Sequence, residues 1–224
     1  MKLLEPIVAW HHDISQIRRD IHAHPELAFE EFRTADVVAA KLEEWGIEIH
    51  RGLGGTGVVG IIRGDQPGER AVGLRADMDA LPMQEANTFD HASKHEGKMH
   101  ACGHDGHTAT LLAAAQALAQ RGQFDGTLHL IFQPAEEGHG GAQKMIADGL
   151  FERFPCDAVY SFHNEPGYPA GHFGFRAGAM YSSSDTVVLT VSGVGGHGAM
   201  PHVAVDPVVA AAHIVLALQT IVSR

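Results

Sequence analysis

Several of the 17 histidines in this chain stand beside a cysteine or beside carboxylates, in patterns that can bind metal. The most compact pattern places Cys102 two residues before His104, with Asp105 and His107 close behind. Thiolate and imidazole both bind zinc and related metals, so this pair can reach one ion or a pair of ions. The alternative is a buried cysteine beside surface histidines, but a core cysteine rarely has glycine, histidine and aspartate within one turn. We therefore interpret Cys102 and His104 as metal ligands.

A second pattern is the pair of adjacent carboxylates Glu136 and Glu137. Adjacent residues at the end of a strand point in different directions, so one carboxylate can bind metal while the other acts as a general base on a water molecule. Such a pair taken alone is usually solvated. Here Gln-Pro-Ala precedes it and Gly-His-Gly-Gly follows it, which indicates a rigid loop that a ligand can approach closely.

Three polar clusters directly follow apolar runs that are typical of β-strands. Asp77 and Asp79 follow residues 71–76, the two glutamates follow residues 127–132, and His163 follows residues 158–162. In open α/β sheets ligands bind outside the carboxyl ends of the strands, so we expect all three clusters on one edge of the sheet.

Two of these clusters have alternative interpretations. His163 can be an exposed histidine at the end of a strand. Asp77 and Asp79, which we expect to orient ligand imidazoles together with Asp105, can instead cap a helix or a turn.

His197 lies in a glycine-rich stretch, residues 193–202. Glycine on both sides of it permits tight turns and close approach of the backbone to a ligand. This histidine can therefore donate a hydrogen bond to an oxyanion, and the alternative is a structural turn with an incidental histidine.

The elements that must position these residues alternate along the chain, which indicates an α/β fold with a largely parallel sheet. Apolar periodicity and end signals predict helices over residues 6–23, 30–45, 105–120, 141–148 and 207–222. Short apolar runs predict strands over residues 47–50, 57–63, 71–76, 127–132, 158–162, 171–175 and 186–192.

Residues 176–185 are small and polar and indicate a boundary between domains. We expect residues 1–184 to form the N-terminal part of a catalytic domain. Residues 185–224 contain one strand, one loop and one helix, which is too little to bury both faces of an independent domain. We therefore expect them to be the beginning of a second domain that the chain does not complete.

Composition excludes some classes of function. The formal charge of -11 argues against nucleic acid or an anionic membrane surface as the main partner. Two cysteines are too few for a disulfide framework, and no apolar stretch approaches the length of a membrane span. We expect a soluble cytoplasmic protein whose partner is a small molecule.

Six stretches taken together resemble a known family, the M20 metallopeptidase superfamily, in its aminoacylase/hippurate hydrolase branch of amidohydrolases. They cover most of the chain in the expected order: RRDIHAHPELAFEE (18–31), GLRADMDALPM (73–83), MHACGHDGHTATLL (99–112), FQPAEEGHGGAQKMIADGL (132–150), FHNEPGYPAG (162–171) and GVGGHGAMPH (193–202). The resemblance implies a zinc-peptidase-like α/β catalytic domain with flanking helices, and a smaller α+β satellite domain through which the protein forms a homodimer.

The same resemblance implies roles for individual residues. The residues that match the family's metal ligands are Cys102, His104, Glu137 and His163. Glu136 matches the general base, and His197 matches a satellite-domain histidine that reaches the active site of a neighbouring subunit. Members of the family are described with two divalent ions, which are Mn, Zn, Co or Ni.

The resemblance also implies a further histidine ligand near the C-terminus, which the 224 residues do not supply. We therefore expect these residues alone to hydrolyse substrate poorly. The expected reaction is metal-dependent hydrolysis of the amide bond of an N-acyl amino acid, with N-benzoylglycine, N-acetyl amino acids and N-acetyldiaminopimelate all compatible.

Two alternatives from other classes remain open. One is a cysteine hydrolase that uses Cys102 with His104 or His107. The other is a non-catalytic fragment that keeps the fold or the dimerisation surface without the activity.

Overall fold

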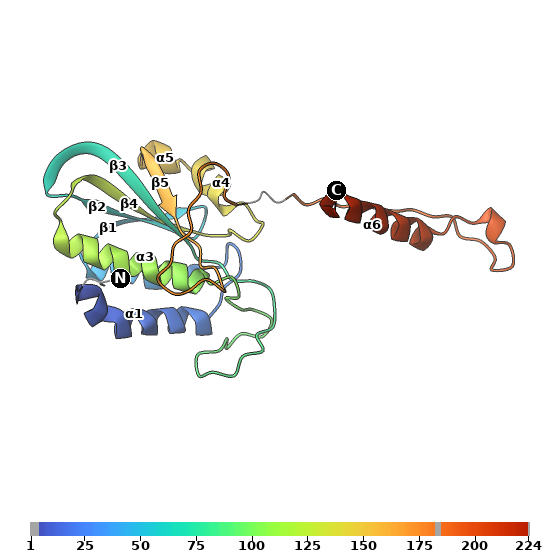
Figure 1. Cartoon of the computed structure of the whole chain (residues 1–224), viewed down its shortest axis with the longest axis horizontal. Coiled ribbons are helices and arrows are strands. Elements are labelled where there is room, and N and C mark those ends of the chain that lie inside the picture. Colours follow the sequence, from blue (N-terminus) through green and yellow to red (C-terminus); the bar gives the residue numbers. More distant parts are fainter. Residues whose placement is uncertain (1–4, 182–184, 224) are drawn as a thin grey trace. The chain divides into compact units, whose positions relative to one another are not determined.

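A computed structural model of the chain describes residues 5–181 and 185–223. These residues divide into two compact units, the first ending at Gly174 and the second beginning at Phe175. The first unit contains a five-stranded sheet in the order β1-β2-β4-β3-β5 (Figure 1). Its strands are β1 (Glu48–Leu53), β2 (Gly57–Arg63), β3 (Gln66–Asp77), β4 (Asp125–Gln133) and β5 (Ala158–Ser161).

The helices agree closely with those expected from apolar periodicity. The first unit contains α1 (Glu5–Ala23), α2 (Phe32–Glu44), α3 (His104–Arg121), α4 (Gly141–Ala147) and α5 (Leu150–Arg153). Of these, the short helix α5 was not predicted. The second unit contains the 3-10 helix η1 (Pro201–Val203) and α6 (Pro207–Ser223), which begins at the predicted proline.

The sheet is mixed, so the prediction of a mostly parallel sheet was only partly right. β4, β3 and β5 run parallel to one another, whereas β1 pairs with β2 and β2 with β4 in antiparallel fashion. Only a short turn that contains Gly54 and Gly55 joins β1 to β2. Such a short connection permits only antiparallel pairing, because parallel strands need a crossover of a dozen or more residues.

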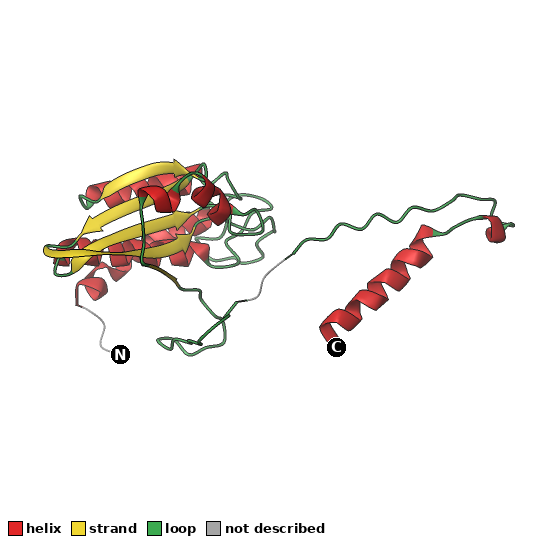
Figure 2. Cartoon of the chain, turned by 90° about the horizontal axis from the view of Figure 1, so that it is seen from above, coloured by secondary structure: helices red, strands yellow, loops and turns green. Residues whose placement is uncertain are grey.

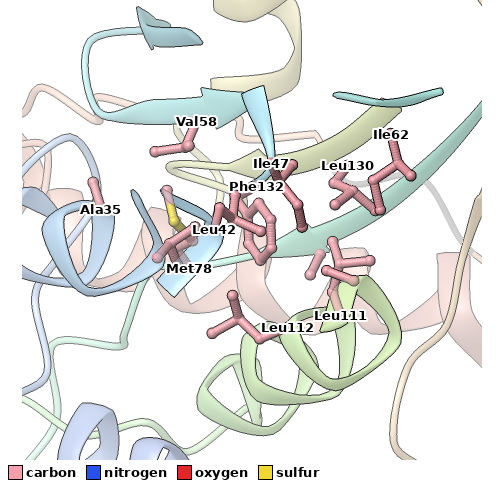
Figure 3. Packing of buried hydrophobic residues seen from close by; sticks show 13 residues of the cluster. Ala35, Leu42, Ile47, Val58, Ile62, Met78, Leu111, Leu112, Leu130 and Phe132 are labelled. Carbon is pink, nitrogen blue, oxygen red and sulfur yellow. The ribbon is translucent and has the colours of Figure 1, made fainter. Parts of the chain in front are cut away.

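Helices cover both faces of this sheet, as Figure 2 shows. On one face, α2 and α3 pack against the sheet through a fully buried cluster that includes Leu42, Leu112, Leu130 and Phe132 (Figure 3). Each such side chain stabilises the fold by about 1.5–3 kcal/mol relative to exposure. This cluster fixes α3, whose first turn contributes to the site described below.

The opposite face carries a smaller buried cluster. Val59 and Ile61 of β2, together with Ile131 of β4, pack there against Met145 of α4 and Leu150 of α5. Neighbouring residues along β2 and β4 thus alternate between the two clusters, as the two-residue period of a strand requires. The loop between β4 and α4 therefore has a buried apolar side chain in the strand before it and another in the helix after it, Ile131 and Met145.

Two predicted strands, residues 171–175 and 186–192, were wrong. Among the residues that the structure describes there, none pairs with a neighbouring strand. In the described part of the second unit, the only bridge joins Val194 and Val205. A strand is stabilised by the backbone hydrogen bonds of a partner, so an apolar pattern alone does not produce one.

The division into domains at residues 184 and 185 stays a prediction. A dimerisation domain is not evident in the described residues of the second unit. Of the helices described in the chain, none is both long enough and apolar enough to cross a membrane.

Candidate metal centre

The polar clusters that follow the three parallel strands lie at one edge of the sheet, as the sequence predicted. Asp77 and Gln133, the last residues of β3 and β4, are directly paired. β5 pairs with β3 in the same direction and ends two residues before His163. The carboxyl ends of these strands therefore bring the carboxylates and the histidine to a common edge.

The fourth cluster reaches this edge through the start of α3. His104 is the first residue of the helix, and Gly103 before it has a φ of 98°. The positive φ favours glycine at position 103, and a Cβ atom there would lie 2.3 Å from Oδ1 of Asn164, so that side chain would have to move to admit one. This close approach places Sγ of Cys102 3.2 Å from Nε2 of His163.

Among the described residues, atoms that could bind a metal converge at this edge in three overlapping groups. In each group the atoms lie within 4.8 Å of one another. His104 belongs to all three groups. They are Cys102, His104 and His163; Asp77, His104 and His107; and His104, Glu136 and Glu137.

One ring nitrogen of His104 has a carboxylate partner, and the other has no hydrogen-bond partner. Its Nδ1 lies 3.2 Å from Oδ1 of Asp79. Its Nε2 is buried and has no hydrogen-bond partner. The Oε1 atom of Glu137 lies 3.8 Å from this nitrogen, and that oxygen is also buried without a hydrogen-bond partner. Leaving a buried polar atom unpaired costs about 1–3 kcal/mol. A cation between these two atoms would satisfy both, so the residues present fit a metal.

The surroundings of Cys102 determine whether its thiol is protonated. Burial and the neighbouring carboxylate of Glu137 raise the pKa of its thiol to about 12. The thiol therefore stays protonated unless a cation replaces the proton. A cysteine hydrolase needs the opposite, a thiolate favoured by its surroundings, so this finding argues against that alternative.

His104 itself is surrounded by acid groups. Burial opposes its protonation, but the hydrogen bond to Asp79 and the charge of Asp77 outweigh burial and raise its pKa. The surplus of negative charge in this buried space again favours a cation as a bound partner.

Glu136 and Glu137 differ in their surroundings, as expected of adjacent residues at the end of a strand. Glu136 keeps 43% of its side chain exposed against 25% for Glu137, and its Oε2 lies 3.8 Å from Nε2 of His104. Burial and the charge of Asp77 raise the pKa of Glu136. A carboxylate that is partly exposed and whose pKa is raised is a good candidate for moving protons.

Two further residues at this edge, His107 and Arg75, were not predicted to contact Asp77, although the sequence indicated His107 as a possible partner of Cys102. Nδ1 of His107 lies 2.6 Å from Oδ1 of Asp77, and Arg75 makes an ion pair of 2.7 Å with Oδ2 of the same residue. Burial opposes ionisation of Asp77, but these partners lower its pKa to about 2. His107 lies three residues after His104, a spacing that shares one helix face and could have indicated it.

The remaining predicted residues lie in different places. Oδ2 of Asp79 accepts the backbone N–H of Glu137 at 2.9 Å, so Asp79 contacts two of the predicted ligands. Asp105 instead faces His22 and Arg18, each 3.0 Å from its Oδ2. His197 belongs to the second unit, and its role stays a prediction.

Comparisons with known proteins show which family the chain resembles and which relatives it has. The model of peptidase family M20/M25/M40 matches residues 73–223. A hippurate hydrolase from Campylobacter jejuni is 50% identical over 224 residues, which is 100% of this chain and 58% of that protein. An N-acetyl-L-cysteine deacetylase from Bacillus subtilis is 44% identical over 93% of this chain and 50% of its own length.

A solved structure provides a further comparison. The Bacillus subtilis YXEP protein, described as a dinuclear metal binding peptidase from the M20 family, has a TM-score of 0.69 and 42% identity. The match covers 73% of this chain and 45% of that one. The chain thus spans about half the length of the relatives that it matches.

Proposed function

Because the chain belongs to peptidase family M20/M25/M40, we propose that it hydrolyses the amide bond of N-acyl amino acids with the help of two divalent metal ions. The observation that carries the proposal is the pair of buried, unpaired atoms at the edge of the sheet, Nε2 of His104 and Oε1 of Glu137. Cys102 and His163 lie in contact beside them.

The proposed ligands are Cys102, His104, Glu137 and His163, and the proposed ions are Mn, Zn, Co or Ni. Thiolate, imidazole and carboxylate together suit metals of this kind. Bound divalent ions polarise a carbonyl and lower the pKa of a water molecule.

Glu136 is the proposed general base. It takes a proton from the attacking water and returns it to the amine that leaves, so one carboxylate serves both halves of the reaction. Its partial exposure leaves room for the water and for the substrate. Asp79 orients His104 and the backbone of Glu137 throughout.

His197 is proposed to donate a hydrogen bond to the carbonyl oxygen as negative charge develops on it, from the neighbouring subunit of a homodimer. The family resemblance supports this role.

The proposed substrates are small N-acyl amino acids. Two relatives support this class by their names, the hippurate hydrolase and the N-acetyl-L-cysteine deacetylase. N-Benzoylglycine and N-acetyl-L-cysteine are therefore the first compounds to test.

The test uses the purified chain after removal of metal with a chelator. Titration with Mn²⁺ or Zn²⁺ should show nearly two ions per chain. Release of the free amino acid should require the added metal and should be slow, because these residues do not supply the further histidine ligand that the resemblance implies. Failure to take up metal, or hydrolysis that a chelator does not affect, contradicts the proposal. Metal binding without hydrolysis of any N-acyl amino acid rejects the activity and supports a non-catalytic role.

A further inference from the structure

The loop that carries Glu136 begins with a residue in a conformation that is rare for an L-amino acid. Ala135 has a φ of 52°, and among the described residues other than glycine only Phe29, with a φ of 63°, shares the left-handed region. A side chain makes this region costly, so the surroundings must hold the backbone there. Both residues therefore need an identifiable restraint.

One carboxylate oxygen restrains both residues. Oε1 of Glu31 accepts the backbone N–H of Ala135 at 2.8 Å and the backbone N–H of Phe29 at 3.0 Å. Oε2 of Glu31 accepts the hydroxyl of Thr56 at 2.5 Å. Glu31 has no exposed surface, and a buried carboxylate is tolerated only when it is well hydrogen-bonded.

The rest of the loop is fixed on its other sides. The carbonyl of Ala135 accepts the backbone N–H of Gly141 at 2.9 Å, and a Cβ at position 141 would lie 1.8 Å from the carbonyl oxygen of Pro134. Glu137 donates its backbone N–H to Asp79. Among the hydrogen bonds of the described residues, the one from Ala135 to Glu31 joins this loop to the segment between α1 and α2, 104 residues earlier.

We propose that Glu31 is a positioning residue whose carboxylate holds Ala135 in the left-handed conformation and thereby aims the side chains of Glu136 and Glu137 at the metal centre. A rotation at Ala135 would turn both following carboxylates away from His104. The roles of Glu136 and Glu137 rest on the proposed function, whereas the restraint on Ala135 does not.

The first variant to test is Glu31→Gln, which removes the negative charge at nearly constant size. Amide hydrogen exchange at Ala135, affinity for Mn²⁺, and kcat and KM for N-benzoylglycine are measured in the metal-loaded chain, with exchange repeated without metal. Because hydrogen bonds to charged groups are the stronger ones, we expect exchange at Ala135 to be about tenfold faster or more and Mn²⁺ affinity to fall by a similar factor. We expect kcat to fall more than KM rises.

A second substitution separates positioning from general stabilisation. Glycine adopts positive φ without a steric cost, so Ala135→Gly in the Glu31→Gln background should recover much of the Mn²⁺ affinity and kcat. Phe29→Gly is the matched control, because Phe29 has the same conformation and the same acceptor but precedes no proposed ligand. It should recover thermal stability without recovering metal affinity.

Equal recovery by the two glycine variants, or unchanged Ala135 exchange and Mn²⁺ affinity in Glu31→Gln, overturns the inference. Should Glu31→Gln fail to fold, Glu31→Asp replaces it, since the shorter side chain keeps the charge but cannot reach Ala135 and Phe29 together. If the parent chain binds Mn²⁺ but hydrolyses no N-acyl amino acid, the proposed function fails. Exchange and affinity still decide the role of Glu31 in that case.

Discussion

Asp79 holds the imidazole of His104 by its Nδ1 atom, at 3.2 Å, and so turns the opposite nitrogen toward the space between Asp77 and the two glutamates. The second oxygen of Asp79 accepts the backbone N–H of Glu137. One carboxylate therefore orients two residues from different elements, α3 and the loop after β4. Histidine ligands commonly owe their orientation to such a carboxylate.

Replacing Asp79 by asparagine should weaken metal binding. The amide has the same shape, but when its oxygen accepts the backbone N–H of Glu137 its NH2 group faces Nδ1 of His104. His104 must then carry its proton on Nε2, the atom that we propose binds metal. We expect Zn²⁺ affinity to fall about 10- to 100-fold, measured by competition with a chromogenic chelator. Asp90→Asn, at an exposed position, is the control and should bind as the parent chain does. An unaltered affinity in Asp79→Asn would show that Asp79 does not orient the site.

Glu136→Gln should separate metal binding from turnover. The amide cannot accept a proton, so we expect kcat for N-benzoylglycine to fall about 10²- to 10⁴-fold while metal content stays the same. The matched variant is Glu137→Gln, one residue along the chain, which should lose metal. Elemental analysis and steady-state rates measure the two effects. A glutamine variant at position 136 with normal turnover would remove it from the role of general base.

The two cysteines offer a matched pair of substitutions. Cys102→Ala removes a proposed ligand, so its metal content and metal-dependent thermal stabilisation should both decrease. Cys156, whose thiol lies 3.4 Å from Nδ1 of His129, is outside the three groups of ligating atoms. Cys156→Ala should therefore retain the metal content of the parent chain. The same metal content in both variants would count against ligation by Cys102.

His129 should make the stability of the chain depend on pH. Burial, aided by the charge of Arg63, lowers the pKa of His129 below its ordinary value of 6.5. As the pH falls below about 6.5, His129 therefore binds a proton more readily in the unfolded chain than in the folded chain. Stability should therefore be fully present above about pH 6.5 and decrease as the pH falls toward the lowered pKa.

The test compares His129→Gln with the parent chain. The free energy of unfolding is measured by denaturant titration at about pH 7.5 and about pH 5.5, and its decrease between them should be smaller in the variant. His12→Gln, at an exposed position of α1, is the control and should keep the decrease of the parent chain. An identical pH dependence in all three proteins would contradict the prediction.

The sequence predicted the edge of the sheet well because that prediction depends on local order. Apolar runs that lead into polar clusters indicate strand ends, and parallel strands bring such ends together. The positions of Asp77, Glu137 and His163 at this edge follow in this way from the sequence alone. The antiparallel pairing of β1 with β2 and of β2 with β4 was not predicted. The order of helices and strands along the chain does not determine the direction in which two strands pair.

Residues whose importance depends on distant contacts could not be found from the sequence. Glu30 and Glu31 are adjacent and chemically identical, yet the side chain of Glu30 is 62% exposed and Glu31 is completely buried. No periodicity distinguishes them, because the partner of Glu31 is a backbone amide 104 residues away. His107 was named in the sequence only as a possible partner of Cys102, whereas its contacts in the structure are Asp77 and Asn164, which follow or end strands far along the chain.

The contact between Gly103 and Asn164 has a consequence for how this protein can change over time. Any side chain at position 103 would be strained by its φ of 98° and would displace the side-chain amide of Asn164, whose Oδ1 lies 2.6 Å from Nε2 of His107. In a library of random variants selected for metal uptake, position 103 should therefore tolerate as few replacements as the ligands on either side of it. Gly103 would then be as intolerant of substitution as the proposed ligands, although it contributes no ligand atom itself.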